Sequence, residues 1–413
     1  MKQSHLKNSL KRTWIPLLSL FILMIGSSFL LTLTVLRLGH MHAPPILIGS
    51  MTAALYAGLA AGSFQAEPLI ARVNHVRAYT TFVSIFSVTC LLQGLFVNAW
   101  FWLSLRFICG FSIAGALIVV ESWLLAKSTF KTRGVILSLY MISLYCAQSF
   151  GQLFINTKQL NSLQPFVIVA LLSSISLIPL AIGKMNMPRI TAHSSLSFKK
   201  LYRLAASSIV AAFCGGLMQS SINGLLPYYL KLQKYPLNEV SYMMAITLFG
   251  GMCLQYPMGR LSDIVERRLV LALICIASIL ICTQVILTHH ILILMYTSLF
   301  ILGGLIFTIY PVSISYGCDA LSRHEIVAGT QGLLLAYSIG AMLGPILSPF
   351  FITLFGPEGL FVYFISISGL LSVYLMWRRT QKVANPQDEP FLAVTGTTPI
   401  SAELDPRSDE EAI

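Results

Sequence analysis

Long apolar runs alternate with short polar segments along the whole chain. Each run approaches or exceeds the ~20 residues that an α-helix needs to cross the hydrocarbon of a bilayer. The runs are continuous rather than alternating between apolar and polar residues, which favours helices over the strands of a membrane β-barrel. The pattern predicts twelve membrane-spanning helices, at residues 15–36, 45–66, 78–98, 101–125, 134–155, 164–183, 205–230, 240–258, 269–288, 291–317, 327–352 and 359–377.

Charged residues are scarce and lie almost entirely between these runs. Only 10% of the 413 residues are charged, while 56% are hydrophobic; a soluble protein carries roughly 25% charged residues. Among the 27 Lys and Arg and the 15 Asp and Glu residues, only Arg106 and Glu121 fall inside a predicted span. This distribution excludes a soluble, collagenous or disordered chain and predicts an all-α membrane protein.

Basic residues between the spans predict the orientation in the membrane. If the N-terminus is cytoplasmic, the cytoplasmic segments hold 22 Lys and Arg residues and the outer segments hold four. Such a bias places both termini in the cytoplasm. The net charge of +12 is therefore an orientation signal, and we expect no nucleic-acid partner.

The longest internal cytoplasmic segment, residues 184–204, separates six spans from six. The tail that follows the last span is rich in proline and acidic residues, a composition typical of disorder. We therefore expect five regions: a cytoplasmic N-terminus (1–14), an N-terminal six-helix half (15–183), a central linker (184–204), a C-terminal six-helix half (205–377) and a disordered cytoplasmic tail (378–413).

Two loops at matching positions in the halves indicate an internal duplication. The loop ARVNHVR (71–77) and the loop GRLSDIVERR (259–268) are both short and basic, and each joins the second and third spans of its half. Repeated halves are typical of secondary transporters.

The second loop also carries a family resemblance. QYPMGRLSD (255–263), followed by Arg267 and Arg268, resembles the conserved cytoplasmic loop of the major facilitator superfamily, although the first loop has Asn74 where the family's second glycine stands. RFICG (106–110) resembles the family's helix 4 arginine motif, and GAMLGP (340–345) its Gly-Pro motif, here in the eleventh span. A finer resemblance, to the YcaD-like bacterial subgroup, rests on ESWL (121–124), RG (133–134), GQL (151–153) and YPV (310–312).

This resemblance implies the major facilitator fold in a bacterial inner membrane, with helices 1, 4, 7 and 10 around a central cavity. The loops would act as gates: Gly259 lets helix 8 end, and Asp263 bonds Arg267 or Arg268 to clasp the halves in one conformation. Simple cytoplasmic anchoring is the alternative. The gating residues that we expect are Arg72, Arg77, Gly259, Arg260, Asp263, Arg267, Arg268 and Asp319.

The two charges inside the spans are candidate functional groups. An arginine within a membrane helix must face a cavity, a partner or the headgroups, so Arg106 either contacts the solute, controls a nearby proton site or snorkels to the outer surface. Glu121 lies ~22 Å further along the same helix and cannot reach Arg106. It either forms a clasp with a basic loop, carries a proton, or is an ordinary surface residue.

Uncharged polar residues within the spans are the candidate solute contacts. The alternative for each is an interhelical hydrogen bond. Helix position favours Asn223 and Tyr310, which the resemblance places on cavity-lining helices, and Gln148 stands one turn from Gln152. Further candidates are Tyr140, Tyr145, Gln219, Tyr228, Gln331 and Tyr337.

We therefore expect a secondary transporter that moves a small solute by alternating access between two halves. Proton coupling is typical of the class, but no carboxylate lies near the middle of a span, which favours uniport or coupling through Glu121, His40 or His42. A membrane sensor that retains the transporter fold is the alternative, suggested by the acidic tail and the degenerate first loop. We expect a monomer in the lipid bilayer. Because the sequence lacks nucleotide-binding, zinc-binding and hydrolase motifs, we also expect no cofactor and no metal.

Overall fold

The computed structural model describes residues 2–128, 132–156, 160, 162–182, 198–321, 325–381 and 398–399. These residues form twelve α-helices and one short 3-10 helix. The helices are α1 (Lys2–His40), α2 (Pro45–Val73), α3 (His75–Leu95), α4 (Ala99–Lys127), α5 (Arg133–Leu153), η1 (Phe154–Asn156), α6 (Gln164–Ile182), α7 (Phe198–Leu232), α8 (Leu237–Ile264), α9 (Arg267–Thr288), α10 (Leu292–Cys318), α11 (Ile326–Phe355) and α12 (Gly359–Gln381).

All twelve α-helices are long and apolar enough to cross a membrane, which confirms the all-α prediction and the number of spans. Several helices extend beyond the predicted spans, and the prediction that α8 ends at Gly259 is wrong. Helix α8 continues to Ile264, and in this last turn the buried Ser262 donates to the Gly259 carbonyl oxygen. The predicted linker and tail fall largely on residues 183–197, 382–397 and 400–413, outside the described part of the chain.

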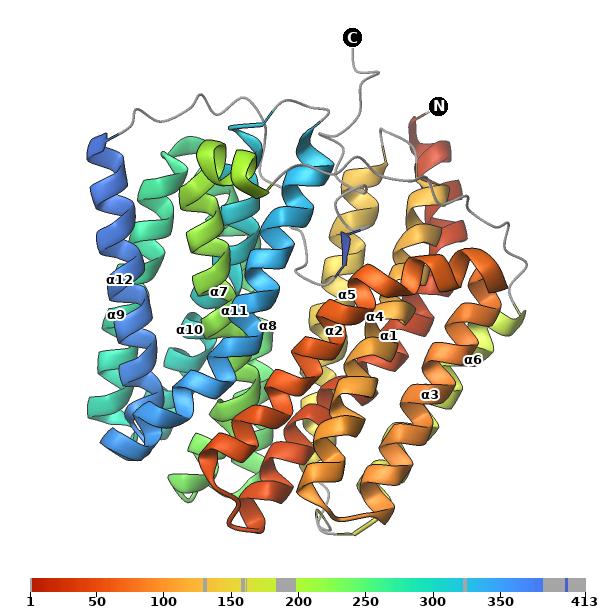
Figure 1. Cartoon of the computed structure of the whole chain (residues 1–413), viewed down its shortest axis with the longest axis horizontal. Helices are drawn as coiled ribbons and strands as arrows, with labels where there is room; N and C mark the ends of the chain where they lie inside the picture. The colour runs from red at the N-terminus through yellow and green to blue at the C-terminus, as the bar shows by residue number, and fades with distance from the viewer. Residues whose placement is uncertain are drawn as a thin grey trace.

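The helices form two groups of six that stand side by side (Figure 1). Helices α1–α6 make up the N-terminal half and α7–α12 the C-terminal half. The start of α1 and the end of α12 lie at the same end of the bundle (Figure 1), which we call the termini side; the other end is the opposite side. Odd-numbered helices run from the termini side to the opposite side, and even-numbered helices return.

Glycines at equivalent helix crossings reveal the duplication in three dimensions. A Cβ atom on Gly58 would lie 2.0 Å from the Phe107 carbonyl oxygen, so α2 and α4 are in backbone contact. In the C-terminal half, a Cβ atom on Gly250 would lie 2.0 Å from the Phe300 carbonyl oxygen where α8 crosses α10. Small residues at such crossings let membrane helices approach closely.

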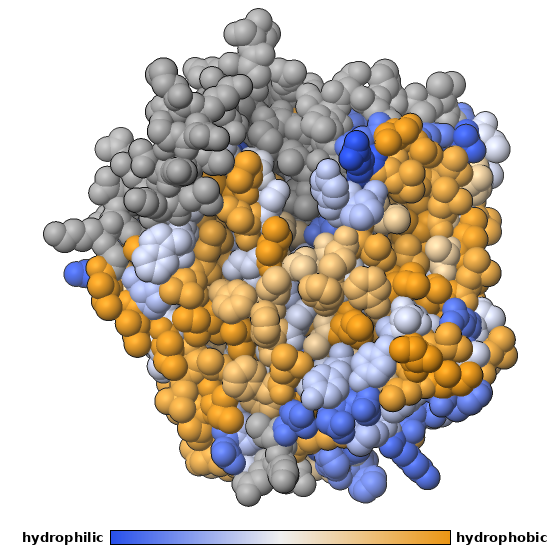
Figure 2. All heavy atoms as spheres, turned by 180° about the vertical axis from the view of Figure 1, so that it is seen from behind, coloured by the Kyte–Doolittle hydropathy of each residue, from blue (hydrophilic) through white to orange (hydrophobic). Residues whose placement is uncertain are grey.

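The outer surface of the bundle matches a lipid environment. Figure 2 shows apolar side chains over most of the middle of one face, with polar residues gathered toward its lower edge. Large apolar side chains such as Leu171, Leu280 and Leu370 are more than half exposed. Because water-soluble monomers rarely expose large continuous apolar patches, this surface supports a membrane-embedded bundle.

Candidate functional site

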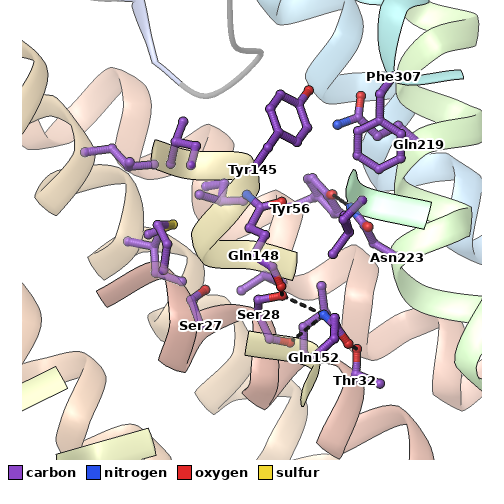
Figure 3. Close-up of a pocket in the computed structure, with 18 of the residues that line it drawn as sticks. Ser27, Ser28, Thr32, Tyr56, Tyr145, Gln148, Gln152, Gln219, Asn223 and Phe307 are labelled. Atoms are coloured by element: carbon purple, nitrogen blue, oxygen red, sulfur yellow. Dashed lines mark hydrogen bonds between the residues drawn. The ribbon is translucent and has the colours of Figure 1, made fainter. Parts of the chain in front are cut away.

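A cavity of about 140 Å³ lies at the seam between the halves. Its wall comes from α1, α2, α4 and α5 on one side and from α7, α8, α10 and α11 on the other. These eight helices include α1, α4, α7 and α10, which the family resemblance led us to expect around the cavity. No Asp, Glu, Lys, Arg or His is among the described residues that line it. Polar or aromatic lining residues are Ser27, Ser28, Thr32, Tyr56, Tyr145, Gln148, Gln152, Gln219, Asn223, Phe307, Tyr310 and Tyr337 (Figure 3).

One part of this polar wall is fixed by internal hydrogen bonds. The Gln152 amide nitrogen donates to the Ser28 hydroxyl oxygen at 2.6 Å, and the Thr32 hydroxyl donates to the Gln152 carbonyl oxygen at 2.8 Å (Figure 3). Gln152 is only 2% exposed. Both ends of its amide are therefore engaged in joining α1 to α5.

Another part of the wall carries polar groups that are free to bind. In the described part of the chain, the side-chain amides of Gln148 and Gln219 and the hydroxyls of Tyr145, Tyr310 and Tyr337 make no hydrogen bond, yet all five side chains line the cavity. The Tyr310 and Tyr337 rings lie 4.5 Å apart between centroids. A polar wall with unused donors and acceptors, backed by aromatic rings, is typical of a small-molecule site.

On the opposite side of this cavity the halves are in direct contact. The Asn223 amide donates to the Tyr56 hydroxyl oxygen at 3.0 Å, joining α7 to α2, and the Ser241 hydroxyl donates to the Gln152 backbone oxygen at 2.7 Å, joining α8 to α5. A Cβ atom on Gly49 would lie 1.7 Å from the Pro345 carbonyl oxygen. These contacts leave little space between the halves on this side.

Arg106 lies outside the set of residues that line the cavity. Its side chain is 1% exposed, so it does not snorkel to the surface. Among the described residues, its Nε and Nη2 atoms have no hydrogen-bond partner. The Arg106 guanidinium is close enough to Tyr56, which lines the cavity, to interact with it electrostatically. Arg106 is therefore near the cavity without being part of its lining.

Glu121 is also remote from the cavity and lies near the termini side. It is fully buried and accepts hydrogen bonds from the hydroxyls of Tyr140 on α5 and Thr398 in the C-terminal segment. Thr398 is 1% exposed. The chain thus returns after α12 to the N-terminal half, a contact between residues 277 positions apart that no local sequence pattern could reveal.

The second loop, residues 259–268, forms an ion cluster within the C-terminal half in which Arg267 and Asp319 are buried. Arg267 Nη1 lies 2.7 Å from Asp319 Oδ1, and Arg267 Nη2 lies 3.2 Å from Asp263 Oδ1. Arg268 contacts the Tyr316 hydroxyl and donates to the Arg378 carbonyl oxygen at 3.2 Å. These contacts tie α8, α9, α10 and α12 together, while Arg260 is exposed.

The first loop, residues 71–77, differs from the second in its contacts. Arg72 and Arg77 are exposed, and Asn74 between them caps α3 by accepting from the Val76 amide at 3.2 Å. Asn74 has a φ angle of +82° and a ψ angle of +145°, a combination found almost exclusively at glycine. The backbone here is therefore one that suits the family's glycine, and asparagine adopts it at a cost in strain.

Sequence reasoning expected the first helix at the cavity but missed the individual lining residues of α1 and α2. Ser28 and Thr32 are one turn apart on α1, a spacing that could have indicated a polar face, and Tyr56 is the lone tyrosine of its span. Gln331 and Tyr228, in turn, are not among the described lining residues. In the part of the chain that the structure describes, no group of three or more His, Cys, Asp or Glu side chains is arranged to hold a metal ion.

Comparisons with known proteins agree with this architecture. The model of the Major Facilitator Superfamily matches residues 17–332 and 209–403. The chain is 30% identical over 371 residues to the MFS-type transporter YcaD of Escherichia fergusonii, covering 89% of this chain and 95% of that protein. It is 32% identical over 378 residues to YcaD of Salmonella paratyphi A, covering 90% and 96%.

Two solved structures share the fold at low sequence identity. The nucleoside transporter NupG aligns with a TM-score of 0.74 at 16% identity, covering 90% of this chain and 99% of that one. A bacterial homologue of the human lysosomal transporter Spinster, in an inward-facing and occupied conformation, aligns with a TM-score of 0.71 at 15% identity, covering 90% and 97%. The chain therefore belongs to the Major Facilitator Superfamily and is a membrane transporter rather than an enzyme.

Proposed function

We propose that this transporter moves a small, neutral, polar solute across the bacterial inner membrane by alternating access, with both termini in the cytoplasm. The observation that carries the proposal is the chemistry of the cavity wall. Free amides from Gln148 and Gln219 face free tyrosine hydroxyls, and no charged side chain is among the described lining residues. A charged solute would lose its hydration in such a cavity without a compensating charge.

The position of the cavity supports alternating access. It lies between the halves, and contacts such as Asn223 with Tyr56 join the halves on the opposite side. Because basic residues cluster in the segments on the termini side, we place that side in the cytoplasm. The conformation is then closed toward the outside, and the halves would have to rock before solute could exchange with the outside.

The solute is expected to combine hydrogen-bonding groups with a ring. The Tyr310–Tyr337 pair and the edge-to-face contact between Tyr145 and Phe307, with ring centroids 5.9 Å apart, give the wall flat apolar surfaces on which a ring can pack. Nucleosides have this chemistry, and the shared fold with the nucleoside transporter NupG makes them the first class to test.

The test is uptake by the purified protein in liposomes, with a panel of radiolabelled neutral solutes that includes nucleosides, and of charged relatives of the same size. Gln148→Leu should weaken uptake of the transported solute, whereas the matched control Gln331→Leu, outside the described lining set, should not. Transport only of charged solutes, or equal loss in both variants, would refute the neutral site. Comparing uptake with and without a pH gradient decides between uniport and proton coupling.

A further inference from the structure

Two stripes of cavity-lining residues continue past the cavity toward the termini side. On α4, Ile113 and Leu117 line the cavity, and Glu121 follows on the same helix face, about 6 Å further along the axis. On α5, Leu144 lines the cavity, and Tyr140 lies one turn from it toward the termini side. Glu121 and Tyr140 therefore face the extension of the cavity on that side, where they contact each other.

A residue from the C-terminal segment occupies this extension. The hydroxyl groups of Tyr140 and Thr398 both donate hydrogen bonds to the Glu121 carboxylate. Glu121 is fully buried and Thr398 is 1% exposed, so other parts of the chain cover this contact. Figure 1 shows the short blue segment that contains Thr398 beside α5, toward the termini side. Thr398 thus fills space about one helical turn beyond the cavity.

The place of Thr398 matters because the other side of the cavity is closed. Contacts such as that of Asn223 with Tyr56 join the halves on the opposite side, so the termini side is the side from which a solute would enter. Thr398 lies in that direction from the cavity. Because buried side chains are close-packed, Thr398 must leave before a solute can pass or before α4 and α5 can close against the C-terminal half at this level.

A strap that fixes the distance between the halves is the other role that such a contact could have. Thr398 follows Gln381, the end of α12 in the C-terminal half, and bonds to the N-terminal half. When extended, the connection from Gln381 to Thr398 can span more than ~50 Å. It is therefore too long to hold the halves at one separation, and the segment acts through the space that it fills.

We propose that the segment Thr398–Pro399 is an autoinhibitory plug, held by Glu121 and Tyr140 in the route from the termini side to the cavity. While the plug is bound, solute cannot enter and the halves cannot close at this end; its release permits both. The Glu121 carboxylate is the acceptor that holds the plug, and a hydrogen bond to a charged acceptor is a strong one. Inhibition of transport rests on the proposed function, whereas the plug itself does not.

Alkylation of a cysteine placed in the cavity tests whether the plug blocks the route. Leu144→Cys puts a thiol on the cavity wall; the purified protein is treated with iodoacetamide, and peptide mass spectrometry follows each cysteine separately. Ending the chain after Gln381 removes the plug and should raise the alkylation rate of the new cysteine about fivefold or more. Ending it after Leu404, the matched control, keeps Thr398 and should leave the rate unchanged. The fully buried Cys282 of α9 is the internal reference. Equal rates in the two shortened chains would overturn the proposal.

A second variant tests the hydrogen bond with the whole tail in place. Thr398→Val removes the hydroxyl but keeps the shape of the side chain, so the alkylation rate of Leu144→Cys should rise about fivefold. An unchanged rate in a chain that unfolds at the normal temperature would also overturn the proposal, because Glu121 would then not hold the plug.

Transport gives a separate readout. In the liposome assay, the chain that ends after Gln381 should take up solute faster than the chain that ends after Leu404, and equal rates would contradict inhibition by the plug. If neither chain transports any solute of the panel, the proposed function fails, while the alkylation rates still decide whether the plug blocks the route.

Discussion

Gly49 on α2 faces the backbone of α11 at the seam between the halves, and replacing it by alanine is expected to open the transporter on the opposite side. The added Cβ atom would lie 1.7 Å from the Pro345 carbonyl oxygen and 3.0 Å from the Pro349 Cγ atom. Real Cβ contacts are essentially never shorter than 3.0 Å, so α2 and α11 must separate by at least 1.3 Å, the difference between 3.0 and 1.7 Å. Because the nearest atom is backbone, no side-chain rotation can relieve the clash.

The size of the effect follows from the cost of overpacking. Forcing an extra methyl group into a closed contact costs about 1–3 kcal/mol. If only the closed state has this contact, the ratio of closed to open molecules falls about 5- to 150-fold. Gly369→Ala on α12 is the matched control, because its Cβ atom would meet nothing nearer than the Ile279 Cδ1 atom at 4.0 Å.

The assay measures the distance between spin labels carried by unnatural amino acids at Val97 and His290. Both positions are exposed on the opposite side, one in each half. Gly49→Ala should shift the distance distribution toward longer values, whereas Gly369→Ala should match the unmodified protein. If Gly49→Ala folds with unchanged thermal stability and an unchanged distribution, the contact does not hold the halves closed and our reasoning about the seam fails.

Three further predictions concern fixed polar contacts. Gln152→Leu leaves the Thr32 and Ser28 hydroxyls without their partner and should lower the free energy of unfolding by about 1–3 kcal/mol. The control Gln148→Leu should change the free energy of unfolding by less than about 0.5 kcal/mol. Equal effects of the two variants in thermal unfolding would contradict the distinction between fixed and free amides. Asp319→Asn should cost about 3–5 kcal/mol because it leaves Arg267 partly unbalanced, while Glu266→Gln, which disrupts a contact with the half-exposed Arg379, should cost less than about 1 kcal/mol. Thr398→Ala removes a hydrogen bond worth about 1 kcal/mol to Glu121 and should make the tail about fivefold more sensitive to limited proteolysis; an unchanged cleavage rate would show that this contact does not anchor the tail.

The sequence predicts most of the fold because hydropathy and charge are local signals in a membrane protein. Each span must satisfy its backbone hydrogen bonds internally, so an apolar run of sufficient length becomes a helix whatever its neighbours are. The end of α8 is an instructive exception. A glycine permits a turn at residue 259 but does not require one, and α8 continues beyond it to Ile264.

The site is only partly predictable because the partners of each polar residue are distant in sequence. Gln148 and Gln152 look equivalent on α5, and both line the cavity. Gln152 is held by Ser28 and Thr32, more than 100 positions away, whereas the Gln148 amide stays free among the described residues. Likewise, the distance from Arg106 to Glu121 follows from helix geometry, but the contact of Glu121 with Thr398 comes from the C-terminal segment and depends on the folded chain.

The position of the free amides links solute recognition to movement of the halves. Gln148 belongs to α5 in the N-terminal half and Gln219 to α7 in the C-terminal half, and both border the same cavity. A solute bonded to both amides would bridge the halves, and rocking changes the distance between those amides. Bonds to one half must therefore weaken whenever the halves separate at the cavity, so a solute held by neutral hydrogen bonds can be released at modest cost, whereas a buried ion pair would resist that separation. A neutral wall is thus suited to a transporter that must let its solute go in each cycle.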